Sequence, residues 1–388
     1  MGWRKNFCQG QLRVLFFASL WCAVVRGYRG SNAELAIAVF DGCDHRPCTE
    51  PPYYADAAEG FFEAGRRAPG VGVRHASAFV AERPDVVVFW HDVGSLTSRA
   101  LRSRLDAMRA RFGGDVPAVL MIGKLWKAYE SRMQAVVDWQ RATKHRVLRV
   151  VIPAPHEALC DRFRVGPCRF LGLGTNTTAF RAPWPSARDA AYAFDVGFSN
   201  TMSEQGRDLN CCDRPFESLS DKPGQPCANF KSVYQHYAPL RHEMVCAIPA
   251  FRSAARNLSI FDEGHVDLAT YRRAIWRTKV WPATTELFSH MGPRFYDVLA
   301  SGSAMLIANN DTRAYDAVGL VPGRDFVVAY DSADFAAKVR YYATHEAERR
   351  AIVAQGATDV ERHSWTARGT ALIDEVCEAL GDDARCAS

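Results

Sequence analysis

Apolar and amphipathic stretches alternate along the first half of the chain. Short apolar runs rich in valine predict buried parallel strands, and longer segments with apolar positions at helical spacing predict the helices between them. The expected strands are residues 34–40, 86–90, 116–122 and 146–152, and the expected helices are residues 54–67, 96–112 and 128–143. Because strands and helices alternate, residues 34–182 are predicted to form an α/β domain with a doubly wound parallel sheet.

A second α/β domain is predicted over residues 190–380. Proline, serine and polar residues at 183–189 interrupt the alternation and are typical of a linker. Residues 206–230 are rich in cysteine, proline and aspartate, which favours a disulfide-stapled surface loop. The other expected elements are helices at residues 234–247, 268–277 and 333–344 and strands at residues 258–261 and 304–308.

The stretch with the clearest chemistry is residues 279–310, which reads as strand, polar loop, short helix, glycine break and strand. Pro293 suits the first helical turn, and Gly302 suits the end of the helix. Backbone N–H groups around Met291 and Gly292 have no helical partner and point outward. They therefore predict an anion site.

Side chains of the same stretch indicate that the anion at this site belongs to a sugar nucleotide. The guanidinium fork of Arg294 matches phosphate oxygens, and Asp297 on the same helix face can accept hydrogen bonds from sugar hydroxyls. His290 in the loop and Lys279 in the strand are two further candidates for contact with this donor. The alternative readings are a surface pair of Arg294 and Asp297 on an ordinary helix, and a solvated Lys279.

The motif RFYDVLASG at residues 294–302, followed by SAMLIA, resembles the donor-site motif of GT-B glycosyltransferases. The resemblance is to the branch of spore-maturation CgeB-like (group 1) enzymes, which reads R-x-F-E-A-L-A-x-G before an apolar strand. It continues through GRDFVV at residues 323–328 to the turn at residues 363–365. It implies two Rossmann-like domains that face each other across a cleft, with the nucleotide-sugar donor on the C-terminal domain and the acceptor on the N-terminal one.

Two positions depart from the family pattern. The glutamate of the motif is Asp297, and the first glutamate of the wider Glu-x7-Glu pattern falls on Ser289. These departures leave open a catalytically silent GT-B-like protein that binds a nucleotide or a glycan. A sugar-nucleotide epimerase, which shares the fold, is a third alternative.

Two loops of the first domain hold the candidates for a general base. In open α/β sheets, ligands bind beyond the carboxyl ends of the strands. Asp41 and His45 follow the first expected strand, and His91 and Asp92 follow the second. Any of the four is a chemically suitable base for an acceptor hydroxyl. The alternative is ordinary loop polarity and helix capping.

No metal or cofactor is expected. The sequence has no Asp-x-Asp motif, the paired carboxylates that hold a divalent ion in sugar transferases of the other major fold. Helix dipole and arginine would then stabilise a leaving diphosphate. The net charge of +5 is not clustered, so nucleic acid is not an expected partner.

Residues 1–27 are predicted to be a signal peptide or a short signal anchor. Arg4 and Lys5 precede an apolar run at residues 14–25, which is short for a membrane span but suits a signal-peptide core. Either form places the remaining chain in the lumen of the ER or Golgi, or outside the cell. The alternative is a buried N-terminal helix.

The cysteines agree with an oxidising compartment, since an even number remains after residue 27. Cys211, Cys212, Cys227 and Cys246 are expected to pair among themselves. The other expected pairs are Cys43–Cys48, Cys160–Cys168 and Cys377–Cys386, and the candidate N-glycosylation sites are Asn176, Asn257 and Asn310.

Overall fold

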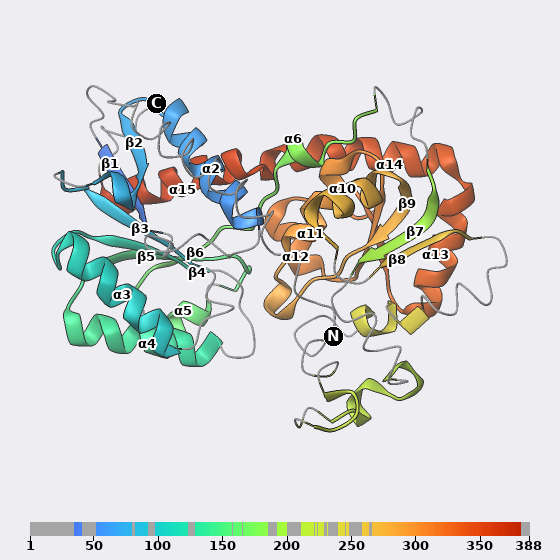
Figure 1. Cartoon of the computed structure of the whole chain (residues 1–388), viewed down its shortest axis with the longest axis horizontal. Coiled ribbons are helices and arrows are strands. Elements are labelled where there is room, and N and C mark those ends of the chain that lie inside the picture. Colours follow the sequence, from blue (N-terminus) through green and yellow to red (C-terminus); the bar gives the residue numbers. More distant parts are fainter. Residues whose placement is uncertain are drawn as a thin grey trace, which may run out of the picture.

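The computed structural model shows two α/β domains side by side (Figure 1). The residues that it describes are 35–40, 52–79, 82–91, 98–122, 129–156, 158–164, 166–184, 192–199, 211–220, 222, 224–228, 231, 240–244, 246–247, 258–263 and 266–381.

The first domain contains a six-stranded parallel sheet in the order β2-β1-β3-β4-β5-β6. Its strands are β1 (Leu35–Phe40), β2 (Val71–His75), β3 (Val86–His91), β4 (Ala118–Ile122), β5 (Val147–Ile152) and β6 (Cys168–Phe170). Its helices are α2 (Pro52–Arg67), α3 (Ser98–Phe112), α4 (Tyr129–Thr143), α5 (Ala158–Phe163) and α6 (Thr177–Phe180). The predicted doubly wound sheet is confirmed.

The second domain contains a five-stranded parallel sheet in the order β11-β10-β9-β7-β8. Its strands are β7 (Phe194–Ser199), β8 (Ile260–Glu263), β9 (Thr278–Pro282), β10 (Met305–Asn309) and β11 (Val327–Ala329). Its helices are α10 (Leu268–Trp276), α11 (Pro293–Ser301), α12 (Thr312–Val318), α13 (Ser332–Thr344) and α14 (Glu346–Asp359). Strand β10 is buried along its whole length, as an apolar run between neighbouring parallel strands requires.

The last helix, α15 (Trp365–Leu380), returns from the second domain to the first and packs along α2 (Figure 1). Glycines allow the two helices to approach closely, because a Cβ atom on Gly60 would lie 2.4 Å from Cβ of Trp365. Arg149 on β5 adds an ion pair with Glu378 at 2.8 Å. The last helix of the predicted second segment thus lies on the first domain and ties the two together.

Replacing Gly60 by alanine is expected to destabilise the protein by about 1–3 kcal/mol, because the added methyl overlaps the backbone and Cβ of Trp365. The thermal denaturation midpoint measures the effect. Glu59→Ala is the control, since Glu59 is an exposed neighbour whose ion pair with Arg66 contributes little. Equal midpoints for the two variants would mean that α2 and α15 can move apart at Gly60 without loss of stability.

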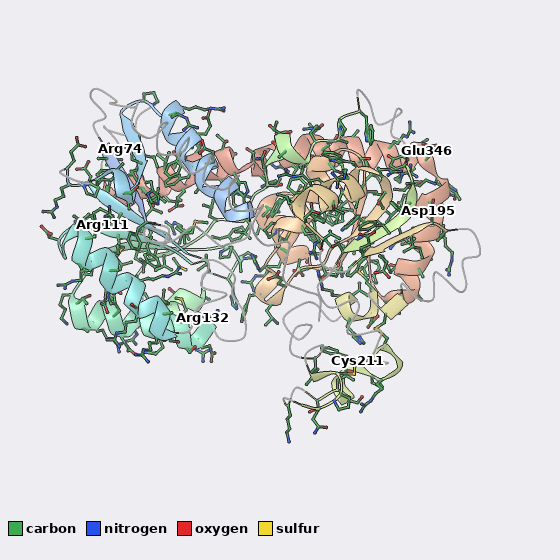
Figure 2. The ribbon with its side chains drawn as sticks, in the orientation of Figure 1. Arg74, Arg111, Arg132, Asp195, Cys211 and Glu346 are labelled. Atoms are coloured by element: carbon green, nitrogen blue, oxygen red, sulfur yellow. A yellow bond between two sulfur atoms is a disulfide. The ribbon has the colours of Figure 1, made fainter. Side chains whose placement is uncertain are left out.

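Two disulfides confirm that the four clustered cysteines pair among themselves. Cys211 bonds Cys227 and Cys212 bonds Cys246, which staples the segment of the second domain that contains Cys211 in Figure 2. Cys168 and Cys377 are also disulfide-bonded. The side chains of their expected partners, Cys160 and Cys386, lie outside the described residues, as does the expected Cys43–Cys48 pair.

No helix in the described part of the chain is long and apolar enough to cross a membrane. The predicted signal segment, residues 1–27, lies outside that part. Two of the three candidate glycosylation sites are described. Oδ1 of Asn176 accepts a hydrogen bond from the N–H of Ala179 at 2.9 Å, and Asn310 is exposed beside a pocket.

Candidate functional site

The carboxyl ends of β9, β10 and β11 form one rim of a pocket of about 480 Å³, a volume typical of a small-molecule site. Thr285 and Glu286 follow β9, Asn309 and Asp311 lie at the end of β10, and Tyr330 follows β11. Leu240 and Glu243 also line it, and Oε2 of Glu243 accepts a hydrogen bond from the N–H of Ser332 at 3.1 Å. The pocket therefore lies where parallel α/β sheets bind ligands.

A buried hydrogen-bond network fixes the rim. The Thr285 N–H donates to Oδ1 of Asn309 at 2.8 Å, and the Thr285 hydroxyl donates to Oδ2 of Asp311 at 2.8 Å. The other oxygen of Asp311 caps α12 by accepting from the N–H of Ala314 at 3.2 Å. These bonds join the loops after β9 and β10 into one rigid wall.

The loop after β9 makes a tight turn closed by a 2.7 Å bond from the Glu286 N–H to the His290 carbonyl. Oε2 of Glu286 lies 3.0 Å from Nδ1 of His290, whose side chain is fully buried. At the tip, Phe288 and Ser289 have φ values of 61° and 59°, a left-handed conformation that is uncommon for residues other than glycine. Such strain persists where the surroundings determine the conformation, and it is concentrated at functional sites.

Helix α11 begins beside this turn. Gly292 is its N-cap and makes no side-chain capping bond, and Pro293 occupies the first turn as predicted. A Cβ atom on Gly292 would lie 3.2 Å from Oε1 of Glu286. The protein's own carboxylate therefore lies close to the helix N-terminus at which an anion was predicted, where the helix dipole favours negative charge. Met291, the other predicted residue, is buried.

Arg294 and Asp297 lie on the side of α11 that faces the junction between the domains. Asp297 is 7% exposed and accepts a 2.6 Å hydrogen bond from the hydroxyl of Thr175 in the first domain. The Arg294 guanidinium lies 5.9 Å from the ring centre of Tyr271 on α10. Burial, and the charge of Asp297, raise the pKa of Tyr271. Neither Arg294 nor Asp297 lines the pocket.

Lys279 is not brought to the pocket either. It lies near the amino end of β9, at the opposite edge of the sheet from Glu286. Its ammonium donates to Oδ1 of Asp195 at 2.7 Å and to the carbonyl of Ala343 at 3.1 Å. The predicted donor residues therefore divide between the turn beside the pocket, the domain junction and the far edge of the sheet.

The predicted acceptor loops follow the strands at which the first sheet reverses its order. Strand β1 lies between β2 and β3, so the chain continues from β1 toward one edge of the sheet and from β3 toward the other. Ligands of open α/β sheets bind at such a reversal of strand order. His91 ends β3 at the carboxyl edge. Asp41, His45 and Asp92 lie outside the described residues.

Sequence reasoning missed Glu286, Asp311 and Tyr330. Each lies within four residues of the end of a strand, and the rule that ligands bind beyond the carboxyl ends of parallel strands predicts their place. Tyr330 is 69% exposed, an unusual fraction for a large aromatic side chain. Nζ of Lys338 lies over its ring, 5.1 Å from the ring centre.

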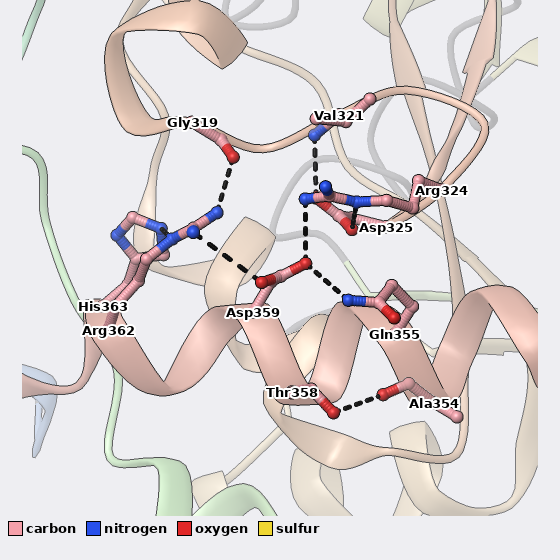
Figure 3. A network of polar contacts seen from close by, with 10 residues as sticks. All are labelled: Gly319, Val321, Arg324, Asp325, Ala354, Gln355, Thr358, Asp359, Arg362 and His363. Atoms are coloured by element: carbon pink, nitrogen blue, oxygen red, sulfur yellow. Dashed lines mark hydrogen bonds and ion pairs between the residues drawn. The ribbon is translucent and has the colours of Figure 1, made fainter.

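A polar network around Asp359 holds the chain where it leaves the second domain (Figure 3). The carboxylate of Asp359 accepts from Arg324 at 2.9 Å and from Gln355 at 2.8 Å, and Arg324 also pairs with the buried Asp325. Arg362 continues the network to the carbonyl of Gly319 at 2.5 Å. The network fixes the turn Val360–His363 that leads into α15.

Comparison with known proteins first defines the class of fold. Sucrose-phosphate synthase from Thermosynechococcus elongatus shares 11% identity at a TM-score of 0.51, covering 89% of this chain and 98% of its own. HepE from Anabaena, solved with UDP and glucose, shares 11% identity at a TM-score of 0.53, covering 88% of this chain and 100% of its own. These likenesses, together with the two parallel sheets, show the GT-B fold that the sequence predicts.

Sequence comparison then shows a likeness over part of the chain. Residues 239–374, which include the pocket, match the family described as glycosyl transferase-like. No curated protein matches the chain in sequence. The chain therefore has the GT-B fold, and residues 239–374 in its second half are similar to glycosyl transferase-like proteins.

Proposed function

We propose that the protein transfers a sugar from a nucleotide-sugar donor, bound in the pocket beyond β9, β10 and β11, to a glycan, protein or other acceptor of the secretory pathway. The observation that carries this proposal is the pocket itself. It lies at the ligand-binding edge of the C-terminal sheet, within the segment that matches glycosyl transferase-like proteins.

The chemistry of the rim suits a sugar nucleotide. The carboxylates of Glu286 and Asp311 are acceptors for hydroxyl groups of a sugar or ribose, and the exposed ring of Tyr330 is a surface on which a base can stack. Glu286 also addresses the departure at Ser289. The family pattern places a glutamate at the position of Ser289. Glu286 supplies a carboxylate in the same turn, three residues before that position.

On the acceptor side, Asp41, His45, His91 and Asp92 remain the proposed candidates for the general base. His91 is the last residue of β3 and the other three follow β1 or β3 along the chain, the strands at which the sheet order reverses. A transferase of the inverting type needs one such base to take the proton of the acceptor hydroxyl.

The reaction is proposed to need neither a metal nor a cofactor, because the sequence lacks an Asp-x-Asp pair. The proposed compartment is the ER or Golgi lumen, or the cell exterior, since an apolar segment with a basic start precedes a cysteine-rich chain. The N-terminal segment is the only proposed membrane contact.

The pocket assignment is tested by replacing Tyr330 with alanine. HepE has been solved with UDP-glucose, so UDP and UDP-glucose are the first ligands to titrate, followed by GDP, ADP and their sugars. The variant is expected to bind the matching nucleotide about 10-fold more weakly, because stacking on an aromatic ring contributes about 1–3 kcal/mol per base.

The control is Tyr341→Ala on α13, a second exposed tyrosine that does not line the pocket. It is expected to bind like the wild type. Tyr330 and Tyr341 are both exposed on the surface, so both variants should have thermal denaturation midpoints close to that of the wild type. Unchanged nucleotide affinity in Tyr330→Ala would contradict the assignment of this pocket as the donor site.

A further inference from the structure

Arg313 and His156 meet across the junction between the two domains. Arg313 is the second residue of α12, and its Nη2 donates to Nδ1 of His156 at 3.2 Å. His156 follows β5 at the carboxyl edge of the first sheet, and its ring centre lies 5.6 Å from that of Phe288. Phe288 and Asp311 line the pocket, so the pair lies at the pocket's mouth.

The charges around the pocket are unbalanced. Its lining includes the carboxylates of Glu243, Glu286 and Asp311 and no lysine or arginine among the described residues. A nucleoside diphosphate would bring further negative charge, which needs cationic partners. Arg313 is exposed and, within the described part of the chain, forms no ion pair with a carboxylate.

Among the described residues neither Arg313 nor His156 forms an ion pair with a carboxylate, so both can offer hydrogen bonds to an anion. Both groups donate hydrogen bonds when protonated, and the guanidinium fork suits phosphate oxygens. Burial and the charge of Arg313 lower the pKa of His156. An anion bound beside the two groups would offset the repulsion between Arg313 and a protonated His156.

We propose that Arg313 and His156 bind the diphosphate of the nucleotide at the mouth of the pocket, one from each domain. This inference rests on the proposed function and adds the two residues that neutralise the diphosphate. Because the partners belong to different domains, diphosphate binding holds the domains together, whereas the base and sugar contacts involve the second domain alone.

The test compares nucleoside diphosphates with their nucleosides by calorimetric titration of the full chain. UDP, GDP and ADP are titrated beside uridine, guanosine and adenosine into the wild type and Arg313→Ala. The variant is expected to bind the matching diphosphate about 10- to 100-fold more weakly, the usual effect of losing a hydrogen bond between charged groups. Its affinity for the nucleoside is expected to stay within about twofold, since the nucleoside lacks the phosphates.

Arg67→Ala is the matched control, because it removes the same charge from an exposed position on α2 and should change neither affinity. Arg313→Lys keeps the charge without the fork and should restore part of the diphosphate affinity. His156→Ala should weaken diphosphate binding in the same selective way, by less than Arg313→Ala.

Several results would overturn this inference while leaving the proposed function intact. One is unchanged diphosphate affinity in Arg313→Ala, with Tyr330→Ala weakening nucleoside and diphosphate alike. Another is equal loss of nucleoside and diphosphate in Arg313→Ala, which would mean that the arginine only shapes the pocket. Unchanged diphosphate affinity in His156→Ala would refute binding from both domains. If the wild type binds no nucleotide at all, the proposed function fails as well.

Discussion

Replacing Glu286 by glutamine is expected to lower kcat/KM for sugar transfer about 10- to 100-fold. The carboxylate lines the pocket, beside the N-terminus of α11, and lies on a turn whose backbone is closed by a 2.7 Å hydrogen bond. A charged acceptor that bonds a sugar hydroxyl contributes about 1.5–3 kcal/mol, and its loss appears in kcat/KM as the corresponding factor. Steady-state kinetics with the matching nucleotide sugar measure this loss.

The substitution preserves the shape of the side chain, so the folded structure should persist, with the amide beside His290 in place of the carboxylate. Glu82→Gln is the control, because Glu82 is exposed on the first domain and pairs only with Arg74 among the described residues. If Glu286→Gln kept full activity, the pocket would hold something other than the reacting sugar.

Acid is expected to destabilise the protein through His363, which is 2% exposed at the junction between the domains. Burial, together with the charges of Arg368 and Arg362, lowers its pKa to about 3. Arg362 Nε lies 3.3 Å from Nε2 of the ring, and Arg368 contacts Nδ1. Protonation would therefore place a positive charge on a buried ring beside two arginines.

The direction of the pH effect follows from the lowered pKa of His363. Because the pKa is lower in the folded state than its ordinary value of about 6.5, the unfolded chain takes up the proton first as the pH falls. The contribution of a neutral His363 is complete above about pH 6.5 and is lost progressively down to about pH 3. At pH 5 the loss is about 2 kcal/mol.

Thermal denaturation at pH 8 and pH 5 of the wild type and His363→Gln measures this effect. His145, His156 and His242 also have lowered pKa values, so they destabilise both proteins in the same direction. The wild type should therefore lose more stability than the variant between the two pH values. Equal losses would show that His363 is not the group responsible.

Much of the fold follows from sequence because buried strands and amphipathic helices leave periodic signals. The apolar runs at β1, β3, β4, β5 and β10 were predicted within one or two residues. Strand β2 was not predicted, because its sequence VGVRH contains a single buried position and lies at the edge of the sheet. Helix α15 shows no sequence signal for the domain on which it packs.

The site was less predictable, because spacing along a helix fixes relative direction but not what the helix faces. Arg294 and Asp297 share a side of α11, as expected, yet that side meets Thr175 and Tyr271. Lys279 lies on the predicted strand but at its amino end. The rim carboxylate of Asp311 is positioned by a hydrogen bond from Thr285 in a separate loop, and that of Glu286 by His290 within a strained turn; neither contact is encoded in a helix or strand pattern.

Calorimetric titration of the wild-type protein with nucleotide sugars tests the central claim most directly. One nucleotide should bind with a stoichiometry of one, both as the diphosphate and as its sugar conjugate, and UDP and UDP-glucose are the first pair to titrate. Glu286→Gln should weaken the sugar conjugate more than the diphosphate, because the glutamate is assigned to sugar hydroxyls. Absence of binding by every nucleotide sugar in the panel would contradict the account.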